Sequence, residues 1–313
     1  MRSFSRALLA LLVFGCGIAH AAWPSDKPIR IVVGFEAGGQ QDIAIRTLAP
    51  YLQKYLQGST VIVENKPGAA GELAYATISH SPPDGYTYST ISVPGFMTMQ
   101  IAGPVNFEPK DLVPVARIVN DDTTLAVNLN SPYKDLKELL QAAKAKPGTI
   151  SFGGSGIGTN DHLAAMLFHE KGIDFNYVPY RGGAGAIQAA LGNHIDVAAT
   201  STAIYDHIQG LRPVVVLAEH RAAVLPNVPT AREQGLDVLM SSERGIATHA
   251  KVPADIRKRF AQAVKTAMDD PEFQAKAQKL GFSLAYLDGE EWSAVLQKRR
   301  ATYQAIWDKT PWQ

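Results

Sequence analysis

Cysteine is almost absent from this sequence of 313 residues, and neither sign of charge is in excess. The one cysteine, Cys16, lies near the N-terminus, so the rest of the chain has no thiol with which to form a disulfide. Lys and Arg number 30 against 29 Asp and Glu, which argues against a nucleic-acid partner because such a partner requires a clustered basic excess. The content of 46% hydrophobic and 19% charged residues indicates a globular protein, and its length suggests two domains.

Motifs for nucleotide, hydrolytic and metal chemistry are missing as well. The segment Gly154–Thr159 has threonine where the dinucleotide fingerprint needs its third glycine, and Ile157 stands where the hydrolase nucleophile elbow needs glycine. His162 and His169 are seven residues apart and have no cysteine partner, so the spacing does not favour zinc. No spaced acid–base pair stands out either. We therefore expect a protein with no catalytic residue, no cofactor and no metal site.

The N-terminus has the pattern of a secretory signal peptide. Arg2 and Arg6 precede the apolar run Ala7–Ile18, which is too short to anchor in a bilayer. Ala19-His20-Ala21 has small residues at the two positions that a signal peptidase recognises, which predicts cleavage after Ala21. An alternative is lipidation at Cys16, although Phe14 fits a lipobox poorly. No later run is long enough to cross a membrane, so we expect an exported, soluble protein.

The first regular segment predicts a strand, a glycine turn and a helix. The β-branched run Ile29–Val33 indicates a buried strand, and Gly38-Gly39 permits a sharp turn. Ile45, Leu48 and Leu52 then recur at helical spacing. A helix that begins after two glycines directs free N–H groups and a positive dipole end into the loop, which is a possible anion site. An ordinary βα turn explains the same residues equally well.

The same pattern recurs along the chain. Strands expected at 60–64 and 86–92, with the helix that carries Ile45, Leu48, Leu52 and Leu56 and a second helix at 73–80, give a β-α-β-α-β order. This order favours a parallel sheet covered by helices. The segment 93–111 is expected to be irregular because it contains three prolines. Two separate strands are expected at 113–119 and 124–128. A second strand, glycine loop and helix follow at 150–171.

The two glycine loops are the main functional signal. Ligands of open α/β sheets bind at the carboxyl ends of the strands, so two helix N-termini that face each other could grip one anion from opposite sides. In the second loop, Ser155 and Thr159 add hydroxyl donors, and His162 lies one turn into the helix. The alternative is two unrelated βα turns.

Taken together, these loops and several further motifs resemble the substrate-binding proteins of tripartite tricarboxylate transporters, the Bug or TctC family. Each motif is weak alone, but their order and spacing are specific. They run over nearly the whole chain after residue 21: Lys27–Val33 with Ala37-Gly38-Gly39 and Asp42, Val63–Gly71, Pro83–Thr87, Lys146-Pro147-Gly148, Gly158-Thr159 with His162-Leu163-Ala164, Val178–Gly182, and Leu225–Thr230.

The resemblance implies an α/β Venus-flytrap fold of two lobes, similar to type II periplasmic binding proteins, with two crossover strands. The expected lobes are 22–127 with 246–313, and 128–245. It also implies a monomeric periplasmic protein that delivers a small organic carboxylate to membrane permease subunits. By resemblance, one ligand carboxylate is held through backbone amides, hydroxyls and waters. The residues are Phe35, Ala37, Gly38, Gly39 and Asp42 in the first loop, and Ser155, Gly156, Gly158, Thr159 and His162 in the second.

Two departures from the family pattern bear on specificity. Glu36 stands where the family often has proline, and it disfavours an anion unless its side chain points outward or meets a cation. Arg244 replaces part of an aromatic-rich segment and could bind a distal carboxylate of the ligand; alternatively, it forms an ion pair with Glu243 or Glu36. Candidates for reading the variable end of the ligand are Ser92, Thr200 and Ser201. A ligand-sensing partner of a membrane receptor and, less plausibly, an exported enzyme acting on a carboxylate are the alternative functions.

Overall fold

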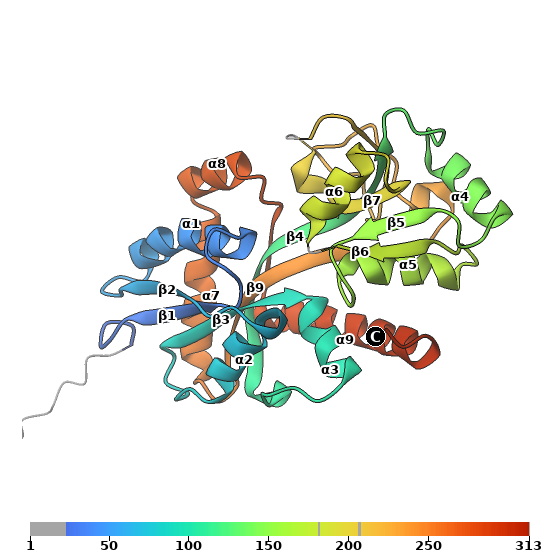
Figure 1. Ribbon diagram of the computed structural model, residues 1–313. Coiled ribbons are helices and arrows are strands. Elements are labelled where there is room, and N and C mark those ends of the chain that lie inside the picture. Colours follow the sequence, from blue (N-terminus) through green and yellow to red (C-terminus); the bar gives the residue numbers. More distant parts are fainter. Residues whose placement is uncertain (1–22, 181, 206–207, 313) are drawn as a thin grey trace, which may run out of the picture.

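A computed structural model describes residues 23–180, 182–205 and 208–312 as an α/β protein with two lobes (Figure 1). The signal peptide expected at 1–21, its cleavage site after Ala21 and the alternative lipidation site Cys16 lie outside the described residues. Within the described ranges, no helix combines the length and the apolar character that a membrane span requires.

The first lobe contains a parallel sheet of the expected order. Strand β1 (Ile29–Val33) lies between β2 (Val61–Asn65) and β3 (Thr87–Val93) and is parallel to both. The connecting helices are α1 (Gln40–Tyr55) and α2 (Glu72–Ser79). The prediction of a β-α-β-α-β unit is therefore confirmed. The same lobe is completed by α7 (Ala254–Met268), α8 (Pro271–Lys279) and the short strand β10 (Leu284–Asp288).

Two long antiparallel strands run from one lobe into the other. Strand β4 (Leu112–Asn128) has 17 residues, and β9 (Ser241–His249) pairs with it and with β3. We call β4 and β9 the crossover strands; they confirm the two-lobed fold. The prediction of two separate strands at 113–119 and 124–128 is wrong. The polar residues 120–123 interrupt the apolar pattern, but the backbone stays extended because these residues pair with 240–243 of the neighbouring chain segment.

The second lobe repeats the strand–loop–helix pattern. Strand β5 (Ser151–Gly154) is parallel to β6 (Asn176–Pro179) and to β7 (Val197–Ser201), whereas β7 and β8 (Leu211–Val216) pair antiparallel with β4. Its helices are α4 (Leu136–Ala145), α5 (Asn160–Glu170) and α6 (Gly183–Leu191).

The segment 93–111 is more regular than expected. It contains helix α3 (Gly95–Ala102) and a single 3₁₀ turn at Pro109–Asp111. The helix lies between Pro94 and Gly103, so the prolines flank it and do not interrupt it. Met97 is buried in it, and Phe96 packs edge-on against Tyr75 with ring centroids 5.0 Å apart. Tertiary packing decides this helix.

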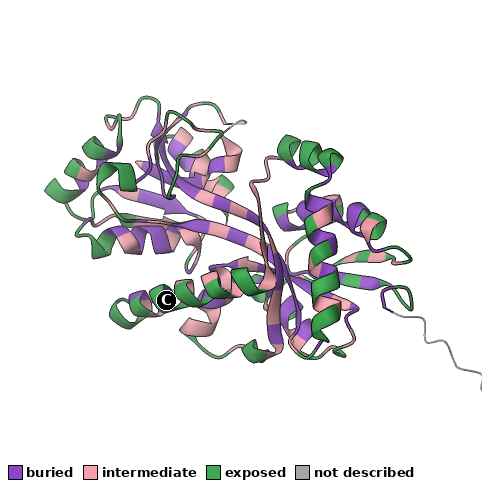
Figure 2. Ribbon diagram, turned by 180° about the vertical axis from the view of Figure 1, so that it is seen from behind, coloured by how far each residue is buried: buried purple, intermediate pink, exposed green. Residues whose placement is uncertain are grey.

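The last helix, α9 (Gly289–Lys309), contacts both lobes (Figure 1). Its buried Trp292 belongs to the same continuous hydrophobic core as Phe168 of α5 and Trp312 near the C-terminus. An ion pair of 2.7 Å joins Lys309 of α9 to Glu170 of α5. Figure 2 shows the buried crossover strands from behind, with exposed residues on the outward faces of the helices. The lobes are thus joined by two strands and by α9.

Candidate functional site

Loop 1, which we define as residues 35–39, connects β1 to α1 and is held by a buried carboxylate. Gly38 has a φ of +80°, a left-handed conformation that favours glycine, and its amide donates to Asp42 Oδ2 at 2.9 Å. Asp42 Oδ1 accepts from Arg46 Nε and from Asn65 Nδ2, both at 2.8 Å. Burial opposes the ionisation of Asp42, but these hydrogen bonds outweigh it and hold the pKa of its carboxyl below the usual value. Asp42 Oδ2 therefore supports the loop, while Oδ1 is held by Arg46 of α1 and Asn65 of β2.

Of the other residues of loop 1, Phe35 packs against the core and two are exposed. The half-buried Phe35 side chain packs against the core of the first lobe. Ala37 and Glu36 are exposed, so the Glu36 side chain does not lie buried beside the loop amides. The amide of Gly39 donates to the Glu36 carbonyl at 3.2 Å. The amides of both glycines are thus used within the loop.

Loop 2, which we define as residues 155–159, connects β5 to α5. Gly158 has a φ of +72°, and its amide donates to His162 Nδ1 at 3.2 Å. Thr159 is the N-cap of α5, and its hydroxyl accepts from the backbone amide of His162. Ser155 donates to Asp161 Oδ2 from its amide at 2.9 Å and from its hydroxyl at 2.5 Å. Like Asp42, the buried Asp161 therefore supports its loop.

His162 is neutral in this position. Burial lowers the pKa of its imidazole to about 4. Its Nδ1 accepts from Gly158, which places the ring proton on Nε2 as a further donor. The ring lies 4.6 Å from that of Tyr177, whose hydroxyl donates to the Gly156 carbonyl at 2.8 Å. Through these contacts, His162 and Tyr177 hold Gly156 and Gly158 of loop 2 in place.

The two loops are built in the same way. In each, the amide of a left-handed glycine donates to a side chain four residues later: Gly38 to Asp42, and Gly158 to His162. The following residues, Gly39 and Thr159, are extended N-caps with φ and ψ of −74° and 164°, and of −83° and 170°. The expected repeat of the strand–glycine loop–helix pattern thus extends to the backbone geometry.

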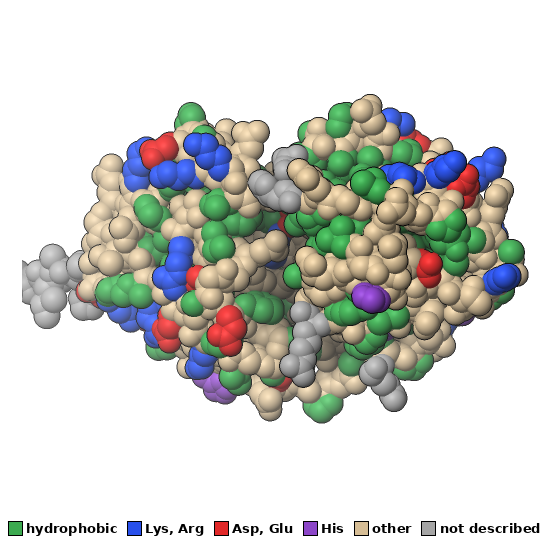
Figure 3. Space-filling view, turned by 45° about the horizontal axis from the view of Figure 1, so that its top comes forward, with side chains coloured by type: hydrophobic (Ala, Val, Ile, Leu, Met, Phe, Trp, Pro, Cys, Tyr) green, Lys and Arg blue, Asp and Glu red, His purple; other side chains and the backbone are tan. Residues whose placement is uncertain are grey.

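Both helix starts are fastened to the crossover strands. Arg244 of β9 donates from Nη1 to the Gln40 side-chain oxygen at 2.7 Å, and Asn160 donates to Thr123 Oγ1 of β4 at 2.9 Å. Gln40 and Asn160 are the first residues of α1 and α5. Arg244 also forms an ion pair with Asp121, which lies two residues from Thr123 on the same strand. The two helix starts therefore lie at the same part of the crossover strands. Figure 3 shows a hollow between the two lobes.

The lobes also touch at loop 2. Thr98 of α3 donates to the Gly158 carbonyl at 2.9 Å. This contact brings a helix of the first lobe against the loop of the second.

Free donors remain in the first turn of each helix. The first amides of a helix have no intrahelical acceptor, and the N-cap Gly39 provides no side-chain cap to α1. The backbone amides of Gln40, Gln41 and Asp42 are therefore directed out of the helix end. In α5, the cap from Thr159 goes to His162, which leaves the amides of residues 160 and 161. The donors suited to an anion thus lie one to three residues beyond the glycines.

The three residues predicted at strand ends lie near the same strands. Ser92 is in register with Arg244, and Ser201 with Thr123. Thr200 is buried, and its hydroxyl donates to Tyr205 at 2.9 Å, whereas Ser201 caps a 3₁₀ turn by accepting from Ala203. Ser92 therefore lies next to Arg244, which reaches the start of α1, while the other two hydroxyls have local partners.

One alternative for Arg244 is corrected by the structure. Its carboxylate partner is Asp121, not Glu243 or Glu36. Successive side chains of a strand point to opposite faces, so Glu243 lies on the other side of β9 from Arg244. There the fully buried Glu243 pairs with Arg117 at 2.8 Å and with Arg299 at 2.5 Å.

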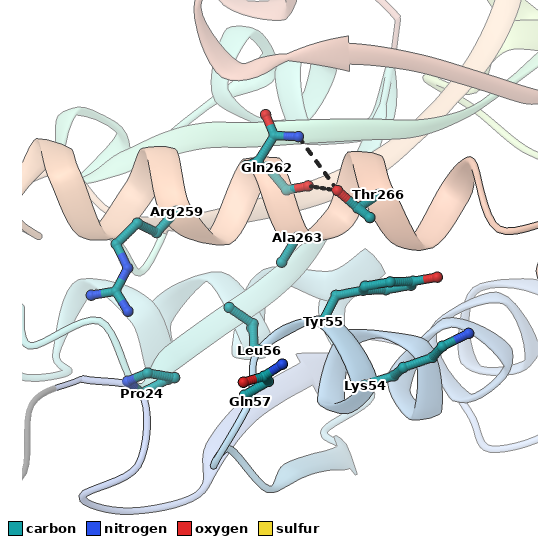
Figure 4. Close-up of a pocket in the computed structure, with 9 residues that line it drawn as sticks. All are labelled: Pro24, Lys54, Tyr55, Leu56, Gln57, Arg259, Gln262, Ala263 and Thr266. Carbon is teal, nitrogen blue, oxygen red and sulfur yellow. Dashed lines mark hydrogen bonds between the residues drawn. The ribbon is translucent and has the colours of Figure 1, made fainter.

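Other possible sites lie away from the loops. In the described part of the chain, no three His, Cys, Asp or Glu side chains come together as a metal site. A surface pocket of about 490 Å³ lies between the C-terminal end of α1 and α7, lined by Tyr55, Gln262 and Thr266 among others (Figure 4). It is separated from loop 1 by the length of α1, about 24 Å at 1.5 Å per residue. It therefore does not belong to the loop site.

Comparison with known proteins identifies the family. The family model described as "Tripartite tricarboxylate transporter family receptor" matches residues 44–310. The chain belongs to this receptor family. It is 33% identical over 288 residues to the UPF0065 protein in the gbd 5′ region of Cupriavidus necator, covering 91% of this chain and 88% of that protein.

Solved structures agree with this assignment. A ligand-free TctC solute-binding protein from Polaromonas is 30% identical, with a TM-score of 0.82 and coverage of 92% of this chain and 100% of that one. MatC from Rhodopseudomonas palustris with bound malate shares the fold at 23% identity, with a TM-score of 0.72 and coverage of 90% and 98%. The expectation of a TctC-type solute-binding protein is therefore confirmed.

Several residues at this site are not apparent from the sequence. Gln40 and Asn160 directly follow the glycine loops, and their matching positions in the two halves are the one sequence signal that could have identified them. Thr98, Asp121 and Thr123 lie in segments whose place in the fold depends on pairing and packing between distant parts of the chain.

Proposed function

We propose that this chain is a periplasmic solute-binding protein that holds one carboxylate of a small organic acid between the first-turn amides of α1 and α5. The observation that carries this proposal is the pair of equivalent loops, both fastened to the crossover strands through Gln40 and Asn160. Helix N-termini favour anions because unsatisfied N–H groups and the dipole act together. The malate bound by the related MatC fits a ligand of this class.

The site works by closure and involves no covalent chemistry. Contacts of one ligand with both loops would stabilise the closed arrangement of the lobes, with the hinge at β4 and β9. We propose lobe boundaries of 22–127 with 246–313, and 128–245. Helix α9 then belongs to the first lobe and also contacts α5 of the second. The mature protein, cleaved after Ala21, would act as a monomer and deliver its ligand to membrane permease subunits of a tripartite tricarboxylate-type transporter.

A proline scan at the two helix starts tests the clamp. Gln40→Pro removes the amide donor of α1, and proline is tolerated at the first helical position. The preceding Gly39 is already extended, as a residue before proline requires. Asn160→Pro does the same in α5, after the extended Thr159. The matched variants Gln40→Ala and Asn160→Ala lose the same side chains but keep the amides.

Affinities would be measured by calorimetry on refolded, ligand-free protein, with a panel of mono-, di- and tricarboxylates and their neutral amides. We expect carboxylates to bind and the amides not to bind. Each proline variant should bind at least about tenfold more weakly than its alanine partner, the cost of one hydrogen bond to a charged group. Equal affinities within each pair would exclude these amides as the clamp.

A further inference from the structure

The carboxyl group of Asp161 is buried at the start of α5, next to loop 2. Its Oδ2 accepts from the amide and the hydroxyl of Ser155, and its Oδ1 accepts from Asn160 Nδ2 at 2.8 Å. These donors are neutral, and in the described ranges of the chain no Lys or Arg forms an ion pair with Asp161. An ionised Asp161 therefore places an uncompensated negative charge at this helix start.

The equivalent carboxylate of loop 1 is compensated. Asp42 is also buried, but its Oδ1 pairs with the guanidinium of Arg46 at 2.8 Å. The two loops thus share their backbone geometry and differ in charge. The charge of Asp42 is balanced by a cation, whereas a proton is the neutralising partner left for Asp161 among the described groups.

The groups packed around Asp161 do not supply that compensation. On β6, the Tyr177 hydroxyl is neutral, since burial and the nearby Asp161 raise its pKa to about 12. On α5 itself, His162 is neutral because burial lowers its pKa to about 4. The charged groups of the neighbouring strands and of the far end of the helix are already paired with each other: Asp121 of β4 with Arg244 of β9, and Glu170 of α5 with Lys309 of α9.

A bound anion would act directly on this carboxyl group. Burial already raises the pKa of Asp161, although the hydrogen bonds from Ser155 partly offset the effect. A ligand carboxylate on the backbone amide of residue 161 would lie close to the side chain of the same residue, and a like charge about 6 Å away raises a carboxyl pKa by roughly two pH units. Ligand binding therefore favours the protonated form of Asp161.

We propose that the protein takes up a proton at Asp161 when it binds a carboxylate, so that binding is linked to pH through loop 2. This inference rests on the proposed function, since it assumes that the ligand carboxylate lies on the first-turn amides of α5. The proton comes from the solvent and binds Oδ2. The Ser155 hydroxyl, 2.5 Å away, then accepts a hydrogen bond where it donated one before.

The sign of the pH dependence follows from this uptake. Protonated protein binds the anion more tightly, so carboxylate affinity is highest at low pH. It falls by up to about tenfold per pH unit as the pH rises from the Asp161 pKa of the free protein to that of the complex.

Calorimetry in several buffers counts the protons. Malate, succinate and butyrate would be titrated into refolded, ligand-free protein at pH 6.5, 7 and 8, each in two buffers of different ionisation enthalpy. The measured heat changes between the buffers in proportion to the protons taken up. At these pH values the acids are largely ionised and His162 is neutral, so the signal reports another group.

Three variants locate the proton. Asp161→Asn removes the charge and retains a carbonyl oxygen that can accept from Ser155. Asp196→Asn is the matched control, because Asp196 Oδ2 also accepts from the amide and the hydroxyl of a serine, Ser151, at 2.9 and 2.6 Å, but at the opposite end of β5. Ser155→Ala provides a second test if the asparagine variant does not fold. It removes one hydrogen bond to the ionised carboxyl, so proton uptake should extend to higher pH.

We expect the wild type to take up at least about 0.3 proton per ligand at one of the three pH values, and to lose affinity as the pH rises. Asp161→Asn should take up no proton and bind at pH 8 at least as tightly as the wild type, while Asp196→Asn should match the wild type throughout. If the wild type takes up no proton, or if Asp161→Asn takes up as much, the inference is wrong and the clamp stands. If no acid binds, both proposals fail together.

Discussion

Replacement of Asp42 by alanine should weaken the protein and its ligand binding together. The carboxylate is buried and accepts three hydrogen bonds of 2.8 to 2.9 Å, from Gly38, Arg46 and Asn65. Arg46 is half exposed and Gly38 is exposed, so water can replace two of these partners. The partly buried amide of Asn65 is less accessible to water, so its lost hydrogen bond is harder to replace. We therefore expect a loss of about 2 kcal/mol of unfolding free energy, near the lower end of the range for hydrogen bonds to a charged group.

This loss corresponds to a fall in Tm of roughly 3 °C for a chain of this size. The effect should depend on pH. Because the pKa of Asp42 is lowered in the folded state, its stabilisation is full above the ordinary carboxyl pKa and is lost as the pH falls through the folded value. Loop 1 would lose its support at Gly38, so we expect carboxylate affinity to fall at least tenfold.

The matched control is Asp135→Ala. Asp135, which belongs to neither loop, is the N-cap of α4 and accepts from the Glu138 amide at 2.9 Å. Loss of this cap should cost about 1 kcal/mol and leave affinity unchanged. Thermal unfolding and calorimetry would be run on both variants. If Asp42→Ala loses no more affinity than Asp135→Ala, or keeps the Tm of the parent, Asp42 does not hold the loop.

Three further predictions concern titration and packing. Burial raises the pKa of Asp122 to about 6, so stability should fall as the pH rises from about 4 to 6, and Asp122→Asn should flatten that slope in thermal unfolding curves. An NMR titration of the His162 ring should give a midpoint near pH 4; a midpoint near the ordinary 6.5 would contradict its burial. Its contribution to stability has the opposite sign and is lost as the pH falls from 6.5 to 4. Gly245→Ala would force a Cβ against the Ala116 carbonyl oxygen and the Trp292 ring, costing about 3 kcal/mol or preventing folding. The control for this change is Gly103→Ala, whose added Cβ meets no atom within 4 Å; equal yields and unfolding curves for these two variants would exclude the clash.

The sequence predicted most helices and strands because their apolar residues recur with clear periods. Strand β1 matches its expected bounds of Ile29–Val33, since the β-branched run that predicts it ends at Gly34. Prediction was wrong where local signals and tertiary packing disagree. The prolines of 93–111 suggested irregular chain, but α3 forms between two of them. The polar residues 120–123 suggested a gap, but β4 continues through it.

The partner of Arg244 could not be read from the chain for a similar reason. The two acidic residues suggested by the sequence do not pair with it. Glu243 is its neighbour in the strand and faces the other way, and Glu36 is an exposed loop residue. Asp121 becomes its partner only because β4 and β9 lie side by side in a particular register. An ion pair between distant residues depends on strand pairing, which local pattern does not specify.

By itself, the sequence determined the strand–glycine loop–helix units, their repetition in the two halves and the family to which they belong. Glycines with positive φ and helical apolar spacing are local properties, so they are visible in the chain order. Only the tertiary structure decided that both helix starts are fastened to β4 and β9, and that Arg244 pairs with Asp121. These features depend on long-range strand register and packing, which bring together residues as far apart in the chain as Gln40 and Arg244, 204 positions.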